Sequence, residues 1–141
     1  AKVTLEQANM IIAAGQAKGR EMGIGPLTIV VLDDGGHLVS MQREDKSGIL
    51  RFEIAFGKAW GGLAIGRSSR ANEADILTRE HFGVALAAAS NGRIIPVAGG
   101  VLIMDSDGNV AGAVGVTGDS SDNDEACAVA GIDAAGLTPK V

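Results

Sequence analysis

A histidine in a glycine-rich turn is the first side chain of this sequence with the means to do chemistry. His37 follows the residues Asp33-Asp34-Gly35-Gly36 and lies between two short apolar runs. An imidazole titrates near neutral pH and is a good ligand for transition metals, so His37 could act as a general base or bind a metal. The alternative is a structural role, in which the ring packs at the edge of a sheet.

Three cations could together form a site for a carboxylate. Arg43 lies just after the second apolar run, while Arg51 and Lys58 lie in a segment predicted to be helical. The planar guanidinium of arginine suits a carboxylate because it can donate two parallel hydrogen bonds. Lys58 sits among apolar residues, where a lysine needs a buried partner or a ligand. The alternative is ordinary ion pairing with nearby acidic residues, which are Glu44, Asp45 and Glu53.

Carboxylates near the end of the sequence offer a general acid or base. Asp122, Asp124 and Glu125 lie at the start of a predicted helix. Positioned carboxyl groups can transfer protons, but acidic residues in a first helical turn also stabilise its positive end. We expect this capping role for Asp122, and we regard Glu125 and Lys58 as the candidate catalytic residues. Cys127 has no neighbouring histidine in the sequence and is expected to be a packed small residue.

Composition argues against several classes of function. The net charge of −5 disfavours nucleic acid as a partner, because binding a phosphate backbone needs a basic face. The two histidines lack the spacing of a zinc site, and no phosphate-binding glycine motif opens a helix after a strand. No run of about 18 apolar residues is present, so we expect no association with a membrane. A single cysteine and the absence of a signal-like N-terminal pattern predict a cytoplasmic protein.

The length and apolar content predict a single domain that associates with copies of itself. The 141 residues are enough for one domain with a real core, spanning 1–141. Hydrophobic residues make up 46 % of the chain, aromatic residues only 3 %, and there are 21 glycines. A chain so rich in small apolar residues often has more apolar surface than one protomer can hide. We therefore expect a homo-oligomer.

The order of the local patterns predicts an α+β fold. The sequence reads as a helix, a hairpin, two helices, three strands and a helix. The helices are expected over about 6–22, 49–65, 72–91 and 119–135. The strands are expected over 27–32, 37–42, Ile94–Val97, Gly100–Met104 and Asn109–Thr117. Strands segregated from helices in this way predict a central antiparallel sheet of about five strands with helices packed on it.

Several short motifs occur in an order that is fairly specific. They are Val31-Leu32-Asp33-Asp34-Gly35-Gly36-His37-Leu38-Val39, Arg43 with Asp45, Lys58-Ala59, Pro96 with Gly99-Gly100-Val101, Gly112-Ala113-Val114-Gly115-Val116-Thr117-Gly118, and Asp124-Glu125-Ala126. With them, the sequence resembles the GlcG/HbpS family of small haem-binding and corrinoid-associated proteins, which includes the C-terminal part of PduO-type proteins. The resemblance runs from about Leu5 to Ala135. It implies an α+β fold, oligomers from dimers upward, and a site or its loop near Asp124 and Glu125.

Two functions of different classes follow. The first is an oligomeric, cytoplasmic protein that binds haem or a related tetrapyrrole, with His37 as the iron ligand and Arg43, Arg51 or Lys58 facing carboxylates. The low aromatic content counts against it, because haem pockets commonly use aromatic contacts. The second is an isomerase, lyase or hydrolase acting on a small carboxylated metabolite, in which an arginine binds the anion and Lys58, His37 or Glu125 moves protons. An accessory subunit without a small ligand is a third alternative.

Overall fold

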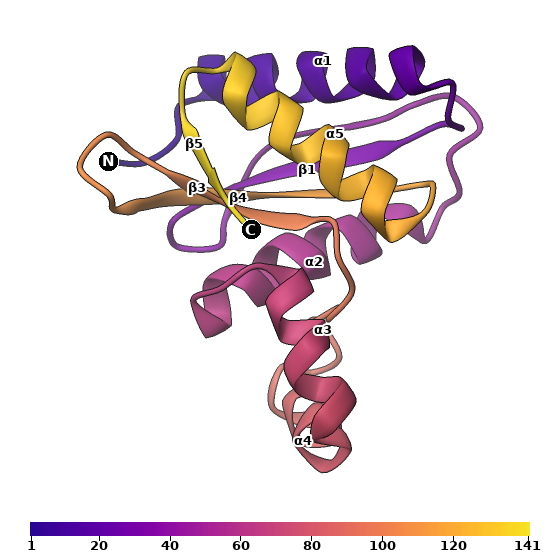
Figure 1. Cartoon of the computed structure of the whole chain (residues 1–141), viewed down its shortest axis with the longest axis vertical. Helices are drawn as coiled ribbons and strands as arrows, with labels where there is room; N and C mark the ends of the chain where they lie inside the picture. Colours follow the sequence, from indigo (N-terminus) through magenta and orange to yellow (C-terminus); the bar gives the residue numbers. More distant parts are fainter.

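Five antiparallel strands form one sheet at the centre of the computed structural model, which describes residues 1–141 (Figure 1). The strand order across the sheet is β2-β1-β4-β3-β5. The strands are β1 (Thr28–Asp33), β2 (Leu38–Arg43), β3 (Gly100–Met104), β4 (Val110–Thr117) and β5 (Thr138–Lys140). The predicted α+β class with a central antiparallel sheet of five strands is confirmed.

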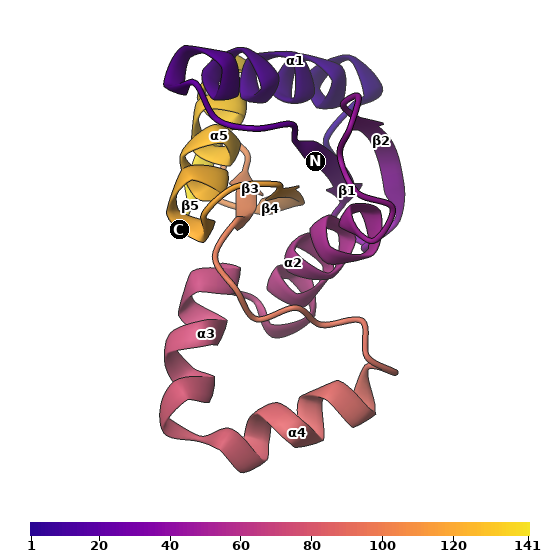
Figure 2. The ribbon, with the colours of Figure 1, turned by 90° about the vertical axis from the view of Figure 1, so that its right-hand side faces the viewer.

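Helices cover both faces of this sheet (Figures 1 and 2). The packed helices are α1 (Leu5–Met22), α2 (Arg51–Ile65) and α5 (Ser121–Ala134). The alternation of β1 divides its side chains between two cores: Ile29 and Val31 pack with α1 and α5, whereas Val30 and Leu32 pack with α2. None of the helices combines the length and the apolar composition needed to cross a lipid bilayer.

Glycines let α2 lie unusually close to its neighbours. A side chain at Gly115 of β4 would collide with the carbonyl group of Ala55 in α2. A side chain at Gly57 of α2 would collide with the carbonyl oxygen of Arg93. Backbone therefore packs directly on backbone at both places, and the position of α2 is fixed on two sides.

The remaining two helices form an arm that projects away from the sheet (Figure 2). The arm consists of α3 (Ser69–Thr78) and α4 (Glu80–Ala89). Ser68 caps α3, because its hydroxyl oxygen accepts the N–H of Ala71. Residues 90–99, here called the return segment, lead back from the arm to β3 alongside α2.

Two local predictions are wrong. Ile94–Val97 is not a strand but part of the return segment. Pro96 has no N–H to donate, and the N–H of Ile95 donates to the Gly57 carbonyl in α2, so this run cannot join the sheet. The fifth strand is β5, which is too short to show an alternating pattern. The helix predicted over 72–91 is two helices, which are separated at Arg79 by a non-helical φ of −141°.

Candidate functional site

His37 lies in the turn between β1 and β2, and its side chain is 78 % exposed. Its Nδ1 is 3.4 Å from Oδ1 of Asp33, which also accepts the N–H groups of Gly35 and His37. A carboxylate at one imidazole nitrogen orients the ring and leaves the other nitrogen for a metal. The chain holds no group of three or more His, Cys, Asp or Glu side chains able to bind a metal ion together. A metal ion bound by His37 would therefore need most of its other ligands from outside the chain.

The surroundings keep Asp33 ionised and place the turn against α2. Burial alone would raise the pKa of Asp33, but the N–H groups of His37 and Gly35 and the charge of Lys2 lower that pKa below its usual value. Gly36 has a φ of +82°, in the left-handed region that favours glycine. A Cβ at Gly36 would lie 3.1 Å from Cδ1 of Trp60. The turn thus borders the C-terminal half of α2.

Arg43 and Arg51 lie at the opposite end of the hairpin. Arg43 of β2 is opposite Thr28 of β1, and Thr28 is opposite Thr117 of β4. The Nη1 of Arg51 donates to Oγ1 of Thr117 over 2.8 Å. Directly opposed residues point to the same face of a sheet. The structure therefore brings these two arginines to the same face and the same end of the sheet.

The expected ion-pairing partners of these arginines are engaged elsewhere or exposed. No ion pair of the chain includes either arginine. Glu44 instead pairs with Arg20 at 2.8 Å and accepts the N–H of Leu27. His37 is not part of this group, because a six-residue strand separates it from Arg43 by about 20 Å at roughly 3.3 Å per residue.

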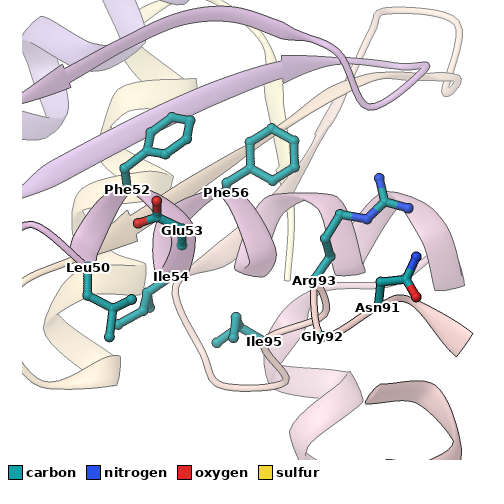
Figure 3. Close-up of a pocket in the computed structure, with 9 residues that line it drawn as sticks. All are labelled: Leu50, Phe52, Glu53, Ile54, Phe56, Asn91, Gly92, Arg93 and Ile95. Carbon is teal, nitrogen blue, oxygen red and sulfur yellow. The ribbon is translucent and has the colours of Figure 1, made fainter. Parts of the chain in front are cut away.

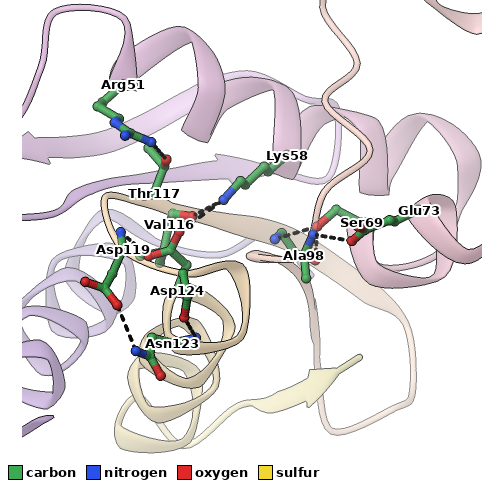
Figure 4. A network of polar contacts seen from close by, with 12 residues as sticks. Arg51, Lys58, Ser69, Glu73, Ala98, Val116, Thr117, Asp119, Asn123 and Asp124 are labelled. Atoms are coloured by element: carbon green, nitrogen blue, oxygen red, sulfur yellow. Dashed lines mark hydrogen bonds and ion pairs between the residues drawn. The ribbon is translucent and has the colours of Figure 1, made fainter. Parts of the chain in front are cut away.

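Lys58 is almost completely buried, with 3 % of its side chain exposed, beside an acidic partner (Figure 4). Its Nζ donates to the Val116 carbonyl over 2.9 Å and lies 3.3 Å from Oδ2 of Asp124. Oδ1 of Asp124 accepts the N–H of Asp119. Burial lowers the pKa of Lys58 and raises the pKa of Asp124, while their mutual attraction opposes both changes. This cluster fastens α2, β4 and the start of α5 together.

Glu125 has a different partner on the surface. Its Oε2 accepts a hydrogen bond of 2.8 Å from Nε of Arg70, and Arg70 also pairs with Asp122. Ser120 is the N-cap of α5, since its hydroxyl oxygen accepts the N–H of Asn123. Asp122 lies in the first turn of α5, where its charge favours the positive end of the helix, as expected. The two side chains predicted to be catalytic therefore have separate partners, and their catalytic roles remain predictions.

Cys127 is a packed core residue, as the sequence predicts. It is fully buried in the cluster between the sheet and the helices α1 and α5. Burial, assisted by the nearby charge of Asp124, raises the pKa of its thiol to about 11. The reactive thiolate form is therefore disfavoured at neutral pH.

Three of the four aromatic side chains of the chain lie on one stripe of α2. Phe52, Phe56 and Trp60 are spaced four residues apart, so they share one helix face. Each is half-buried and packs on the core beneath α2. The ring centroids of Phe52 and Phe56 are 5.9 Å apart, and the guanidinium carbon of Arg93 lies 4.1 Å from the Trp60 ring centroid. We call these three residues the aromatic stripe.

A hollow of about 440 Å³ lies between α2 and the return segment (Figure 3). Its apolar lining residues are Leu50, Phe52, Ile54, Phe56 and Ile95. Its charged lining residues are Glu53 and Arg93, and Arg93 has no ion-pair partner. A hollow of this size, with a mainly apolar lining and a few polar groups, is typical of a site for a small molecule.

The sequence analysis missed this site, although part of its signal was present. The overall aromatic content is low, but the spacing of Phe52, Phe56 and Trp60 is that of a single helix face. The opposite wall of the hollow could not be read in the same way, because the run that supplies it was predicted to be a strand.

Comparison with known proteins decides the family. The family model described as "Haem degrading protein HbpS-like" matches residues 3–133. The chain belongs to the HbpS-like family. This confirms the resemblance drawn from the short motifs. A curated relative, an uncharacterized 15.0 kDa protein from the dhaT-dhaS intergenic region of Citrobacter freundii, is 30 % identical over 135 residues, which are 94 % of this chain and 92 % of the relative.

Solved structures related to this HbpS-like chain share its fold. A PduOC complex with haem has a TM-score of 0.88 at 18 % identity, and the match covers 100 % of both chains. Klebsiella pneumoniae protein ORFY has a TM-score of 0.84 at 26 % identity, covering 96 % of this chain and 92 % of its own. A double mutant of Streptomyces reticuli HbpS has a TM-score of 0.79 at 22 % identity, covering 94 % and 86 %.

Proposed function

We propose that this protein binds haem or a related tetrapyrrole in the hollow beside the aromatic stripe. The observation that carries the proposal is the concentration of three of four aromatic side chains along one half-buried face of α2. Two further findings support it. The description of the family model names a haem-degrading protein, and one solved structure with the same fold is a complex with haem.

The aromatic stripe provides an apolar contact surface for a flat ring system. Phe52 and Trp60 are eight residues apart, which corresponds to about 12 Å along a helix. Aromatic side chains contribute large contact areas and stack well against other rings. Leu50, Ile54 and Ile95 extend the apolar surface beyond the stripe (Figure 3). The lining therefore fits the ring of a tetrapyrrole.

The carboxylates of such a ligand need a cation, and Arg93 is the one that lines the hollow. The guanidinium of Arg93 stacks on the Trp60 ring. It forms no ion pair with an acidic side chain of the chain. Arg51 instead bonds to Thr117, and Lys58 is buried with Asp124. We therefore assign the carboxylate contact to Arg93.

His37 is the proposed iron ligand. It is the exposed imidazole at the Trp60 end of the stripe, and Asp33 orients its ring. When bound, haem would supply the iron, and His37 would supply one nitrogen ligand to it. The other histidine, His81, lies on the exposed surface of α4.

A haemin titration tests this assignment. We expect the wild-type protein to produce a saturable shift of the Soret absorption band. The variant His37→Ala should lose that spectrum. The matched control is His81→Ala, which removes the only other imidazole of the chain and should behave like the wild type. A His37→Ala variant with an unchanged spectrum would disprove the role of His37.

We further propose that the protein acts in the cytoplasm, as its single cysteine suggests, which cell fractionation would test. The enzymatic alternative has less support. Lys58 is enclosed with Asp124, and Glu125 is bound to Arg70, so neither side chain stands free in the hollow.

A further inference from the structure

We infer that Glu53 makes the hollow selective for tetrapyrroles that carry their carboxylates on one edge only. This inference rests on the proposed function and names the class of ligand that the same hollow selects. It starts from two charged side chains in one lining, which are Glu53 on α2 and Arg93 on the return segment. Neither side chain forms an ion pair within the chain.

The two charges lie at different ends of the hollow (Figure 3). The guanidinium carbon of Arg93 is 4.1 Å from the ring centroid of Trp60. Glu53 precedes Trp60 by seven residues on α2, which corresponds to about 10 Å along a helix. Glu53 also lies in the first turn of α2, where the helix dipole favours a negative charge. The hollow therefore has a cationic end at Arg93 and an anionic end at Glu53.

The Arg93 end has hydrogen-bond donors for a carboxylate. Nε of Arg93 donates to the Ser90 carbonyl over 3.3 Å, which leaves its two terminal nitrogens as donors facing no acidic side chain. Asn91, whose side-chain amide is a further donor, lines the hollow beside Arg93 (Figure 3). The carboxylates of a bound ring are therefore expected at this end.

The Glu53 end has the opposite character. The lining side chains that surround Glu53 in the sequence are apolar: Leu50, Phe52 and Ile54. The ionised carboxylate of Glu53 itself can only accept hydrogen bonds. A ligand carboxylate placed here would lose water to an apolar lining and lie near a like charge, and both effects oppose binding.

This polarity distinguishes between two kinds of tetrapyrrole. A ring that lies on the aromatic stripe with carboxylates at Arg93 turns its opposite edge toward Glu53. In protoporphyrin that opposite edge carries apolar vinyl groups, whereas in coproporphyrin it carries further carboxylates. The hollow is therefore expected to bind protoporphyrin more tightly than coproporphyrin, with Glu53 as a specificity-determining residue.

The test is the ratio of the affinities for iron-free protoporphyrin and coproporphyrin, each measured by fluorescence titration. The variant Glu53→Gln should lower this ratio about fivefold, mainly by strengthening coproporphyrin binding. The effect is limited to this size because Glu53 is exposed and solvent screens its charge. Glu53→Lys should lower the ratio further. In about 1 M salt, where screening acts within about 3 Å, the difference between wild type and Glu53→Gln should shrink.

The matched control is Glu21→Gln, which removes the same charge from a side chain 73 % exposed on α1, across the sheet from α2. Its affinity ratio should stay within about twofold of the wild type. The control matters because vinyl groups also make protoporphyrin the more apolar ligand, so the change caused by Glu53→Gln identifies the contribution of the charge.

Two results would overturn the selectivity while leaving the proposed function intact. They are equal affinities of the wild type for both porphyrins, and a Glu53→Gln variant whose ratio matches that of Glu21→Gln. A wild-type protein that binds neither porphyrin would instead refute the proposed function, and the selectivity with it.

Discussion

Replacing Lys58 with methionine is expected to lower the free energy of unfolding by about 3–5 kcal/mol. The substitution removes the ammonium group and leaves the carboxylate of Asp124 buried without its charged partner. The Val116 carbonyl would also lose a donor. Urea denaturation of the two proteins, followed by circular dichroism, would measure the difference.

Two controls separate the loss of this pair from a general loss of charge. Arg70→Ala breaks ion pairs that are partly open to solvent, since Arg70 is 45 % exposed, and should cost no more than about 1 kcal/mol. The double variant Lys58→Met with Asp124→Asn keeps an acceptor for Asp119 but removes the unpaired charge. It should recover part of the stability. A Lys58→Met variant as stable as Arg70→Ala would contradict the structural role of the pair.

Replacing Phe56 with alanine is expected to weaken tetrapyrrole binding by roughly tenfold to a hundredfold. Burying an aromatic side chain against a ligand contributes about 1.5–3 kcal/mol, and 1.4 kcal/mol corresponds to a factor of ten. Phe56 lies in the middle of the aromatic stripe and also lines the hollow. The measurement is a titration with iron-free protoporphyrin, followed by its fluorescence, so that iron ligation makes no contribution.

The matched control is Phe82→Ala. Phe82 is the one aromatic residue outside the stripe and lies in the arm, where Arg79 covers its ring at 4.4 Å. Its loss should leave porphyrin affinity within about twofold of the wild type, since a change below 0.5 kcal/mol is typical of residues without contact. Equal losses for Phe56→Ala and Phe82→Ala would place the ligand elsewhere.

The parts of the fold that the sequence could predict are those with strong local signals. Thr4 and Gln7 form the capping box that begins α1. The Asp-Asp-Gly-Gly turn and the β-branched run before it predicted the first hairpin, because both the turn residues and the strand residues agree. β5 gave no such signal. The Ile94–Val97 run gave a misleading one, since Ile94 and Ile95 lie against α2 and the run does not pair in the sheet.

The same distinction between local signals and long-range contacts applies to the candidate site. The apolar setting of Lys58 indicated that it needs a partner or a ligand, but Asp124 lies 66 positions away and no local pattern joins them. The stripe could be read from its spacing, whereas the hollow could not. Its second wall depends on the return segment reaching α2, and that long-range contact rests on Gly57. Sequence patterns predicted the elements; only the folded chain shows which faces meet.

The most direct test of the proposed function is the position of the iron in a crystal of the protein grown with haemin. Anomalous scattering at the iron absorption edge would reveal it. We predict a single iron site over the aromatic stripe, with Nε2 of His37 as the protein ligand and the ring between α2 and the return segment. An iron site away from Phe52, Phe56 and Trp60 would contradict the account, as would crystals in which haemin occupies no defined position.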